Sequence, residues 1–292
     1  FSSLNTGTIT LRLILFLLIK FIWFYNSNIN ICIIDSNQES LKKSKLLNLG
    51  NIFSETVDIS IEESDIIFIC TPISSYENIL RRLSELKLKN TIITDVGSSK
   101  VKIINLAKQV LKNKIFVPGH PIAGTEKSGP ENGMNDLFKN RWFISTTCDL
   151  CEDKHVSAIN DIWKKFGSKS ITMNAKDHDS IMAITSHIPH LIAYNIVGTA
   201  SELEEDIKSE VIKFSASGFR DFTRIASSDP IMWRDIMLSN KEEIISLLEK
   251  FNKDLEKTIK AIKEDNGKFL FEKLKKKKEI REKIIEAVLH ND

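Results

Sequence analysis

Short apolar runs alternate with amphipathic helical patterns along residues 29–173 of this chain. The apolar runs are predicted strands, at residues 29–34, 66–70, 91–94, 115–117, 142–146 and 170–173. The helical patterns between them lie at residues 38–49, 76–86, 101–111 and 156–166. Because the strands are nearly all apolar, the sequence predicts a parallel sheet covered by helices on both faces. Such sheets bind ligands at the carboxyl ends of their strands, so we expect functional residues just after each strand.

From Asp177 onward the sequence reads as nearly continuous helix. Apolar residues recur there at spacings of three and four and form one stripe, made of Leu248, Phe251, Leu255, Ile259 and Ile262. The lysine-rich run at residues 273–278 is flanked by glutamates, which is typical of a solvated helix face rather than a binding patch. We therefore predict an α/β domain at residues 1–173 and an all-helical domain at residues 174–292.

The composition excludes several classes of protein. The 292 residues carry a formal net charge of +2, which argues against nucleic acid as a partner. Hydrophobic residues make up 42% and charged residues 27% of the chain, a balance typical of globular proteins. Four cysteines are too few for a disulfide scaffold, so a reducing, cytoplasmic location is expected.

The longest apolar run covers residues 11–25. It is shorter than the roughly 20 residues that span a bilayer, and Lys20 interrupts it. The residues that follow it, Asn26-Ser27-Asn28, are a poor signal-peptide cleavage site. We expect a buried helix here and no membrane partner. The first residue is Phe1 rather than Met, as expected of a fragment.

Two segments that follow predicted strands combine glycine with polar residues. TDVGSSK (residues 94–100) leads into a helix, where Gly97 permits a tight turn and the serines either cap the helix or donate to a ligand. In the next segment His120 lies between glycine and proline at a strand end, where an imidazole suits proton transfer near neutral pH. A structural histidine is the alternative. Glu126 follows in a glycine-rich loop that is expected to fold over the site.

Histidines recur in the predicted helical domain, in the segment SHIPH (residues 186–190). His187 and His190 share a helix face, an arrangement compatible with a metal site. The sequence has no HExxH pattern, and Cys148 and Cys151 lack a second cysteine pair. No metal is therefore expected.

The segment GFRDFTR (residues 218–224) places Arg220 and Arg224 four residues apart beside glycine. Two guanidinium groups predict an anion site, because each binds a carboxylate through two parallel hydrogen bonds. Surface ion pairs are the alternative. Shortly after, Pro230 suits the first turn of a helix capped by Asp229.

Together, TDVGSSK, GHPIAGTEKSG, SHIPH and GFRDFTRIASSDPIMWRDI resemble the prephenate dehydrogenase family, which includes arogenate and cyclohexadienyl dehydrogenases. The resemblance runs from about Asn30 to Ala287, with the motifs in the family's order. It implies a Rossmann-like α/β nucleotide-binding domain followed by an all-α dimerisation domain, and hence a homodimer. It also implies NAD-dependent oxidative decarboxylation of prephenate or arogenate in tyrosine biosynthesis.

The resemblance also implies roles for individual residues. His120 accepts the hydroxyl proton of the substrate and is oriented by Ser98. Substrate contacts are implied at Arg224, His190, Glu126, Arg220, Asp221 and Trp233. Cofactor contacts are implied at Asp35, Thr71, Asp95 and Gly97. The SHIPH histidines then face the substrate rather than a metal.

The start of the chain departs from the family pattern of a strand, a G-x-G-x-x-G turn and a helix that binds the pyrophosphate. The corresponding stretch, residues 4–10, contains only Gly7, and the next glycine is Gly50. The second strand nevertheless ends in Asp35, an acid that accepts ribose hydroxyls and repels a 2′-phosphate, so NAD is expected rather than NADP. An altered start of the sequence and a degenerate phosphate site both explain the departure.

We therefore predict an NAD-dependent prephenate or arogenate dehydrogenase. One alternative is a cofactor-impaired relative that dimerises and binds substrate without turnover, which a normal glycine-rich turn in the upstream reading frame would exclude. The other is an NAD-linked dehydrogenase of small hydroxy acids, with a lysine or histidine base in the helical domain and no arginine pair. Prephenate and arogenate differ in one distal substituent, so the motifs do not distinguish them.

Overall fold

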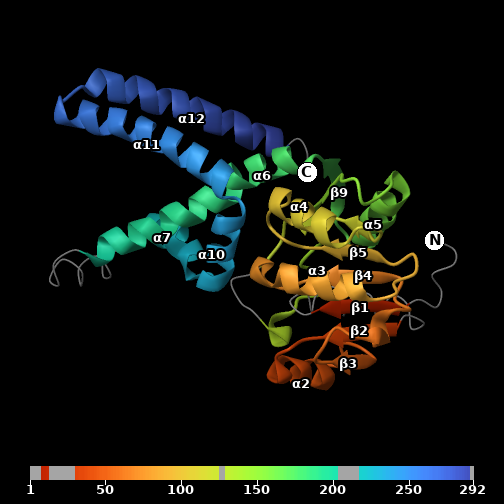
Figure 1. Ribbon diagram of the computed structural model, residues 1–292. Helices are drawn as coiled ribbons and strands as arrows, with labels where there is room; N and C mark the ends of the chain where they lie inside the picture. Colours follow the sequence, from red (N-terminus) through yellow and green to blue (C-terminus); the bar gives the residue numbers. More distant parts are fainter. Residues whose placement is uncertain (1–7, 13–29, 125–128, 203–216, 290–292) are drawn as a thin grey trace. The chain divides into compact units, whose positions relative to one another are not determined.

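The computed structural model describes residues 8–12, 30–124, 129–202 and 217–289, and their contacts divide the chain into two compact units, residues 1–244 and 245–292. Six parallel strands form the main sheet of the first unit in the order β3-β2-β1-β4-β5-β6 (Figure 1). Their bounds are β1 (Thr8–Arg12), β2 (Asn30–Ile34), β3 (Ile52–Ser54), β4 (Ile66–Ile69), β5 (Ile92–Asp95) and β6 (Ile115–Val117). This strand order is that of the Rossmann dinucleotide-binding fold, as predicted.

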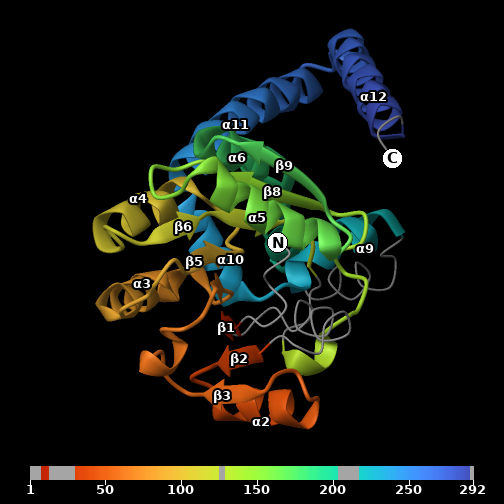
Figure 2. The same ribbon diagram turned by 90° about the vertical axis from the view of Figure 1, so that its right-hand side faces the viewer.

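Successive residues of the buried strands face opposite sides of the sheet. Ile31 of β2 lies in one apolar layer, whereas the next residue, Cys32, lies in the other. The covering helices are α2 (Gln38–Leu46) and α5 (Asp153–Lys165) on the first face, and α3 (Tyr76–Glu85) and α4 (Val101–Val110) on the second (Figure 2). Both faces are therefore buried, which explains why the strands carry almost no polar residues.

The predicted elements of residues 29–173 are all present. The end of α2 and the start of α5 each differ by three residues from the prediction. Helix α2 ends at Leu46, because Asn48 adopts a left-handed backbone with a φ of 50°. Helix α5 begins at Asp153, because the side chains of Glu152 and His155 form a reciprocal cap at its start. The sequence pattern missed both ends because they depend on polar caps rather than on apolar periodicity.

Three strands form a second sheet in place of the single sheet that the sequence predicted. They are β7 (Gly119–Pro121), β8 (Trp142–Thr146) and β9 (Lys169–Met173). The chain reverses after Pro118, so β7 pairs antiparallel with β8 and His120 lies opposite Ile144. Strands β8 and β9 are parallel. His120 therefore lies within a strand rather than in a loop after one. Two short 3-10 turns, η1 (Ile59–Ile61) and η2 (Ile73–Ser75), lie before and after β4. A third, η3 (Pro130–Asn132), lies between β7 and β8.

The first strand corrects two predictions about the N-terminus. Residues Thr8–Arg12 form β1, which pairs with β2 on one side and β4 on the other. Leu11 and Arg12 are thus strand residues, not the start of the helix predicted at residues 11–25, whose remainder lies outside the described residues. Because β1 covers Thr8–Arg12, the segment that follows the first strand begins at residue 13 and not within residues 4–10. The segment that follows β1, residues 13–29, contains no glycine.

Most of the described residues of the first unit after β9 are helical. The helical elements are α6 (Ala175–Met182), a π-helical turn η4 (Ala183–His187), α7 (Ile188–Ser201), α9 (Ser217–Thr223), a 3-10 turn η5 (Arg224–Ser227) and α10 (Pro230–Ser239). The Asp229 carboxylate caps α10 by accepting hydrogen bonds from the N–H groups of Ile231 and Met232, at 2.7 and 3.1 Å. This confirms the cap predicted before Pro230.

The second unit contains most of α11 (Lys241–Lys263) and all of α12 (Gly267–Leu289). Lys273 of α12 donates to the Asp254 carbonyl of α11 at 2.8 Å and to Thr258 Oγ1 at 2.5 Å, which joins the two helices. The apolar stripe of α11 is solvent-exposed in the single chain, with Phe251 at 45% and Ile262 at 59% exposure. Within the described residues, no helix combines the length and apolar character needed to cross a membrane.

Candidate active site

A buried ion pair joins β5 to β7 at the carboxyl edge of the main sheet. Asp95, the last residue of β5, accepts a hydrogen bond from Lys100 Nζ at 2.6 Å, and neither side chain is exposed. Lys100 Nζ also donates to the Gly119 carbonyl at 2.7 Å. The second oxygen of Asp95 accepts from the Gly119 N–H at 2.9 Å. The pair thus fixes the backbone immediately before His120.

Close packing against Phe143 of β8 also restricts β7 at Gly119. A Cβ atom at this position would lie 2.5 Å from the Phe143 ring, so only glycine fits. Gly97 is similarly confined, because a Cβ atom there would lie 2.9 Å from Asp95 Oδ2. The Gly97 N–H donates to this carboxylate oxygen at 2.9 Å. The two motifs that the sequence singled out therefore meet at Asp95.

A chain of hydrogen bonds leads from His120 into the helical part of the unit. His120 Nδ1 lies 2.9 Å from His178 Nε2, and His178 Nδ1 lies 2.8 Å from Asp179 Oδ1. Asp179 in turn accepts from the backbone N–H groups of Lys100 and Val101, at 2.7 and 2.9 Å. Because an ionised carboxylate only accepts hydrogen bonds, His178 Nδ1 carries a proton and donates to Asp179. His178 Nε2 is then unprotonated and accepts a hydrogen bond from the N–H group at His120 Nδ1. This tautomer leaves Nε2 of His120 as a proton acceptor.

The surroundings of His120 keep its ring neutral. Burial lowers the pKa of His120 well below its usual value, and the neighbouring His178, Lys100 and His187 lower it further. Burial also lowers the pKa of His178, although its hydrogen bond to Asp179 opposes that shift. Both rings are therefore uncharged near pH 7, which suits His120 to accept a proton.

The SHIPH segment forms a second group of aromatic rings around Trp233 of α10. The ring of His190 stacks on Trp233 with centroids 3.6 Å apart, and His190 Nδ1 donates to the Ser186 carbonyl at 2.9 Å. His187 meets the same indole edge-on at 6.2 Å, and burial lowers its pKa to about 4. The π-helical turn η4 ends at His187, and such turns recur at functional sites. No cluster of three metal-ligating side chains occurs among the described residues.

The predicted anion site lies on α9 and η5, which pack against α7. Arg220 and Asp221 are in α9, Arg224 begins η5, and all three side chains are exposed. The hydroxyl of Tyr194 in α7 donates to the Ser228 carbonyl at 2.6 Å and holds the end of this segment. Glu126 lies outside the described residues, so its place in the site stays a prediction.

The predicted cofactor residues lie at the carboxyl ends of β2, β4 and β5 of the main sheet. Asp35 follows β2, where its carboxylate accepts from the Asn37 N–H at 2.8 Å. Thr71 follows β4, and no partner among the described residues reaches its buried Oγ1 atom. Gly97 follows β5. Asp95 differs from these, since its carboxylate is enclosed and bonded within the protein. An unpaired hydroxyl at this edge fits a bound ligand.

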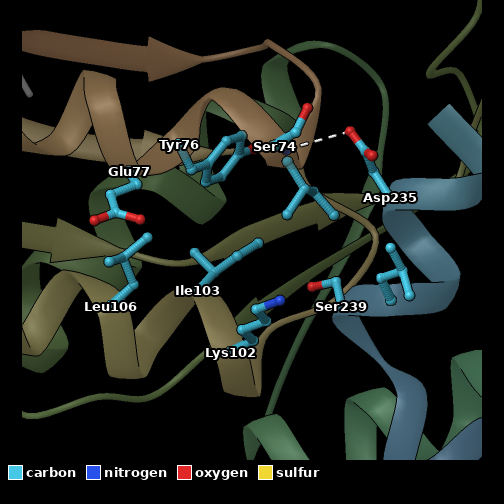
Figure 3. A pocket seen from close by; sticks show the side chains of 10 residues that line it. Ser74, Tyr76, Glu77, Lys102, Ile103, Leu106, Asp235 and Ser239 are labelled. Carbon is cyan, nitrogen blue, oxygen red and sulfur yellow. Dashed lines mark hydrogen bonds between the residues drawn. The ribbon is translucent and has the colours of Figure 1, made fainter. Parts of the chain in front are cut away.

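A separate pocket lies between α3, α4 and α10 (Figure 3). Its wall includes Lys102, Ser74 and Asp235, and the Ser74 N–H donates to Asp235 Oδ2 at 3.3 Å. Ser239 also lines it, and its hydroxyl lies 2.5 Å from that of the buried Ser99. None of the predicted site residues lines this pocket. Its walls instead join α10 to α3 and α4, which cover one face of the main sheet.

Sequence reasoning missed the residues that hold His120 in place. Neither His178 nor Asp179 belongs to one of the motifs, and Lys100 is only the last residue of TDVGSSK. The ring contact that the structure describes for His120 is to His178, whereas Ser98 lies half-buried in the loop before α4. A lysine that follows a glycine-serine turn directly before a predicted helix was the one available signal.

Comparison with known proteins gives consistent results. The family models described as "Prephenate dehydrogenase, nucleotide-binding domain" and "Prephenate dehydrogenase, dimerization domain" match residues 24–172 and 174–276. A cyclohexadienyl dehydrogenase of Zymomonas mobilis is 33% identical, with 88% of each chain aligned. A prephenate dehydrogenase of Bacillus subtilis is 31% identical over 85% of this chain and 67% of its own.

A solved structure also resembles this chain closely. The prephenate dehydrogenase of Aquifex aeolicus, solved with hydroxyphenyl propionate and NAD+, superposes with a TM-score of 0.87 and is 31% identical. The match covers 97% of this chain and 99% of that one. The strand order, the motifs that meet at Asp95 and these similarities agree, and the chain belongs to the prephenate dehydrogenase family.

Proposed function

We propose that this protein is an NAD-dependent dehydrogenase that oxidatively decarboxylates prephenate or arogenate. The observation that carries the proposal is the neutral imidazole of His120, held by His178 and Asp179 at the carboxyl edge of a Rossmann sheet. The A. aeolicus relative was solved with NAD+, and relatives named for prephenate and cyclohexadienyl substrates align with most of this chain.

His120 is the base in the mechanism we propose. Its Nε2 atom accepts the proton of the ring hydroxyl as hydride leaves the same carbon of the substrate. NAD supplies the hydride acceptor. The bond from the ring to its carboxylate then breaks, CO₂ departs, and its electron pair makes the ring an aromatic phenolate. The phenolate oxygen takes the proton back from His120, which returns the base to its neutral form. His178 and Asp179 are positioning residues, because they hold His120 in the tautomer that exposes Nε2.

The cofactor is proposed to lie across the carboxyl ends of β2, β4 and β5. Asp35 accepts the ribose hydroxyls and disfavours NADP, and Thr71 uses its unpaired hydroxyl. Gly97 lets the backbone approach the cofactor. Asp95 acts indirectly in this proposal, by fixing Gly97 through a hydrogen bond.

The substrate is proposed to lie between β7 and the helices α7, α9 and α10. Trp233 has a buried Nε1–H group with no partner among the described residues, which suits a substrate oxygen. His190 stacks on this indole and offers Nε2 as a further contact. Arg224 is proposed to bind a substrate carboxylate, with Arg220 and Asp221 near it and Glu126 in the covering loop. Ser98 is proposed to assist His120.

We further propose that the protein forms a homodimer through its helical domain. We also propose that it is a cytoplasmic enzyme. The exposed stripe of α11 supports the homodimer, since Phe251, Leu255 and Ile259 are 45%, 43% and 43% exposed. Light scattering of the full chain should give twice the monomer mass. Leu255→Glu should give the monomer, whereas Glu256→Gln on the neighbouring face should leave the dimer intact.

Steady-state kinetics test the proposed activity. NADH formation and CO₂ release should rise together with prephenate or with arogenate, at saturating NAD. NADP should support a lower kcat/KM, because Asp35 repels its 2′-phosphate. Substrate binding by calorimetry without NADH formation, even at saturating NAD, would instead identify the cofactor-impaired relative. Turnover of a small 2-hydroxy acid in place of both substrates would identify the third alternative.

A further inference from the structure

Two cysteines outside the proposed active site face each other in one turn. Cys148 and Cys151 lie between β8 and α5, with their Sγ atoms 3.7 Å apart. The Cys151 N–H donates to the Cys148 carbonyl at 3.4 Å, which makes this Cys-x-x-Cys segment a turn. The Cα atoms at the ends of such a turn lie within about 7 Å, and disulfides span about 4.4–6.8 Å. Rotation of the side chains is therefore enough to join the two sulfur atoms.

We propose that Cys148 and Cys151 form a thiol–disulfide exchange site that reacts with small-molecule disulfides and closes reversibly into an intramolecular disulfide. Both side chains are partly exposed. The site is separate from the dehydrogenase chemistry, because neither cysteine contacts His120 or its hydrogen-bond chain among the described interactions.

The backbone holds this turn ready for the reaction. The Phe116 N–H of β6 donates to the Leu150 carbonyl at 3.2 Å, and Thr146 N–H donates to the Pro118 carbonyl at 3.0 Å. Cys148 Sγ donates to the Phe116 carbonyl at 3.2 Å. Cys151 Sγ also lies 3.5 Å from the Cys148 carbonyl as a donor. Oxidation removes these two weak bonds, which the thiols make. The backbone bonds remain in both redox states.

Cys151 is the attacking thiol. It lies one residue before Glu152, the N-cap of α5, a position that favours a thiolate. A hydrogen bond from Cys148 lowers the pKa of Cys151 to about 7, against the opposing effects of burial, Asp153 and Asp149. Lys108 of α4 also faces the turn, where its Nζ lies 2.6 Å from Asp149. The same pairing raises the pKa of Cys148.

The other two cysteines of the chain serve as internal controls. Cys32 in β2 and Cys70 after β4 are each 1% exposed. Burial raises the pKa of Cys32 to about 11 and also raises the pKa of Cys70. Neither presents a thiolate near neutral pH, so we expect both to stay reduced in the folded protein.

The proposed exchange proceeds in two steps. The Cys151 thiolate attacks one sulfur of a disulfide RSSR, which forms a mixed disulfide and releases one thiolate RS⁻. Cys148 then loses its proton and attacks the sulfur of Cys151, which releases the second RS⁻ and closes the Cys148–Cys151 bond. The protein loses two electrons and two protons, and RSSR is reduced to two thiols. Excess thiol reverses both steps.

Incubating the full, reduced chain with oxidised glutathione under nitrogen tests the proposal. Intact-mass measurement should show the loss of two hydrogens, and peptide mapping should place the bond between Cys148 and Cys151. Cys32 and Cys70 should be alkylated only after unfolding. Reduced glutathione should restore the starting mass. A folded chain that keeps four free thiols, or that forms a disulfide through Cys32 or Cys70, would overturn the proposal.

Two matched variants separate the roles of the cysteines. Cys148→Ser should accumulate a glutathione adduct on Cys151, because no second thiol resolves it. Cys151→Ser should form its adduct on Cys148 about tenfold or more slowly, because burial still raises the pKa of Cys148 and its thiol is bonded to the Phe116 carbonyl. Equal rates of adduct formation in the two variants would contradict the assignment of Cys151. The wild-type disulfide measurement stands even if a variant fails to fold.

Discussion

The corner around His120 and the segment that carries Arg220 and Arg224 lie in the same folded unit but differ sharply in burial. At the corner, Asp95 and Lys100 are fully buried and bonded to each other, and His178 and Asp179 continue the network. On α9 and η5 the two arginines are exposed. The family motifs cover both regions. The corner around His120 is nevertheless a buried, hydrogen-bonded network, whereas the arginine segment is exposed.

The difference teaches what each region is required to do. A base must be held in one tautomer before the substrate arrives, and a dry hydrogen-bonded network achieves this. A carboxylate-binding guanidinium, by contrast, has to be exposed where a substrate can reach it. We therefore expect substitutions at the corner to alter the rate or the fold, and substitutions on α9–η5 to alter substrate affinity.

The largest expected effect comes from His120→Asn. Loss of the base should lower kcat about 10²–10⁴-fold with little change in KM. In the unaltered enzyme the rate should fall only when the pH drops well below 6.5, because the pKa of His120 lies far below its usual value. That acidic limb should vanish in the variant. His155→Asn, the same change on α5, is the matched control and should keep normal kinetics.

The second effect concerns the missing glycine-rich turn after β1. Two lost N–H bonds to the pyrophosphate would cost about 3–6 kcal/mol, or roughly 10²–10⁴ in affinity. The chain as given should therefore bind NAD weakly. Replacing the residues before Asn30 with a strand–GxGxxG–helix unit should restore binding in a calorimetric titration. Micromolar binding by the unaltered chain would show that residues 13–29 build a phosphate site without glycine.

Asp95→Asn tests the stability of the corner itself. It leaves Lys100 buried without a charged partner, which should cost about 3–5 kcal/mol of unfolding free energy. Glu77→Gln provides the contrast, since it breaks an exposed pair with Arg81 that contributes about 1 kcal/mol or less. Denaturant unfolding of both variants measures the two losses. Similar losses would mean that the Asp95–Lys100 pair does not hold the corner.

Arg224→Ala tests the exposed region. Loss of a charge-assisted contact worth about 1.5–3 kcal/mol should raise KM for the substrate roughly 10–150-fold. NAD affinity and unfolding free energy should hardly change. Arg81→Ala, another exposed arginine of the same unit, should leave KM unchanged. Equal loss of NAD and substrate binding would point to a disturbed fold rather than to a substrate contact.

The smallest expected effect comes from the link between the corner and the helices. His178→Leu removes the acceptor for His120 Nδ1 and should lower kcat about tenfold, the value of one hydrogen bond of about 1–1.5 kcal/mol. His178→Gln should recover much of the rate, because its side chain offers an acceptor near the same position. A merely structural role would give two variants with equal kcat values and altered stability.

The sequence by itself determined the layered α/β fold, because strands buried on both faces must be apolar throughout. It placed β8 at residues 142–146 without error and put β6 at residues 115–117. It also identified the capped start of α10, since a cap depends on Asp229 and Pro230, which are neighbours in the chain. Family motifs led to His120 and Arg224 in the same way, as local patterns.

Only the tertiary structure decided how these pieces act together. His120 and His178 are 58 residues apart in the chain, and Asp95 and Gly119 are 24 apart. No local pattern encodes such pairs, because they depend on where β7 turns back from the main sheet. The same holds for Lys100, because burial lowers the pKa of its ammonium group and the contact with Asp95 opposes that shift. Local sequence sets which segments are buried, and the packing between segments sets which polar groups face each other.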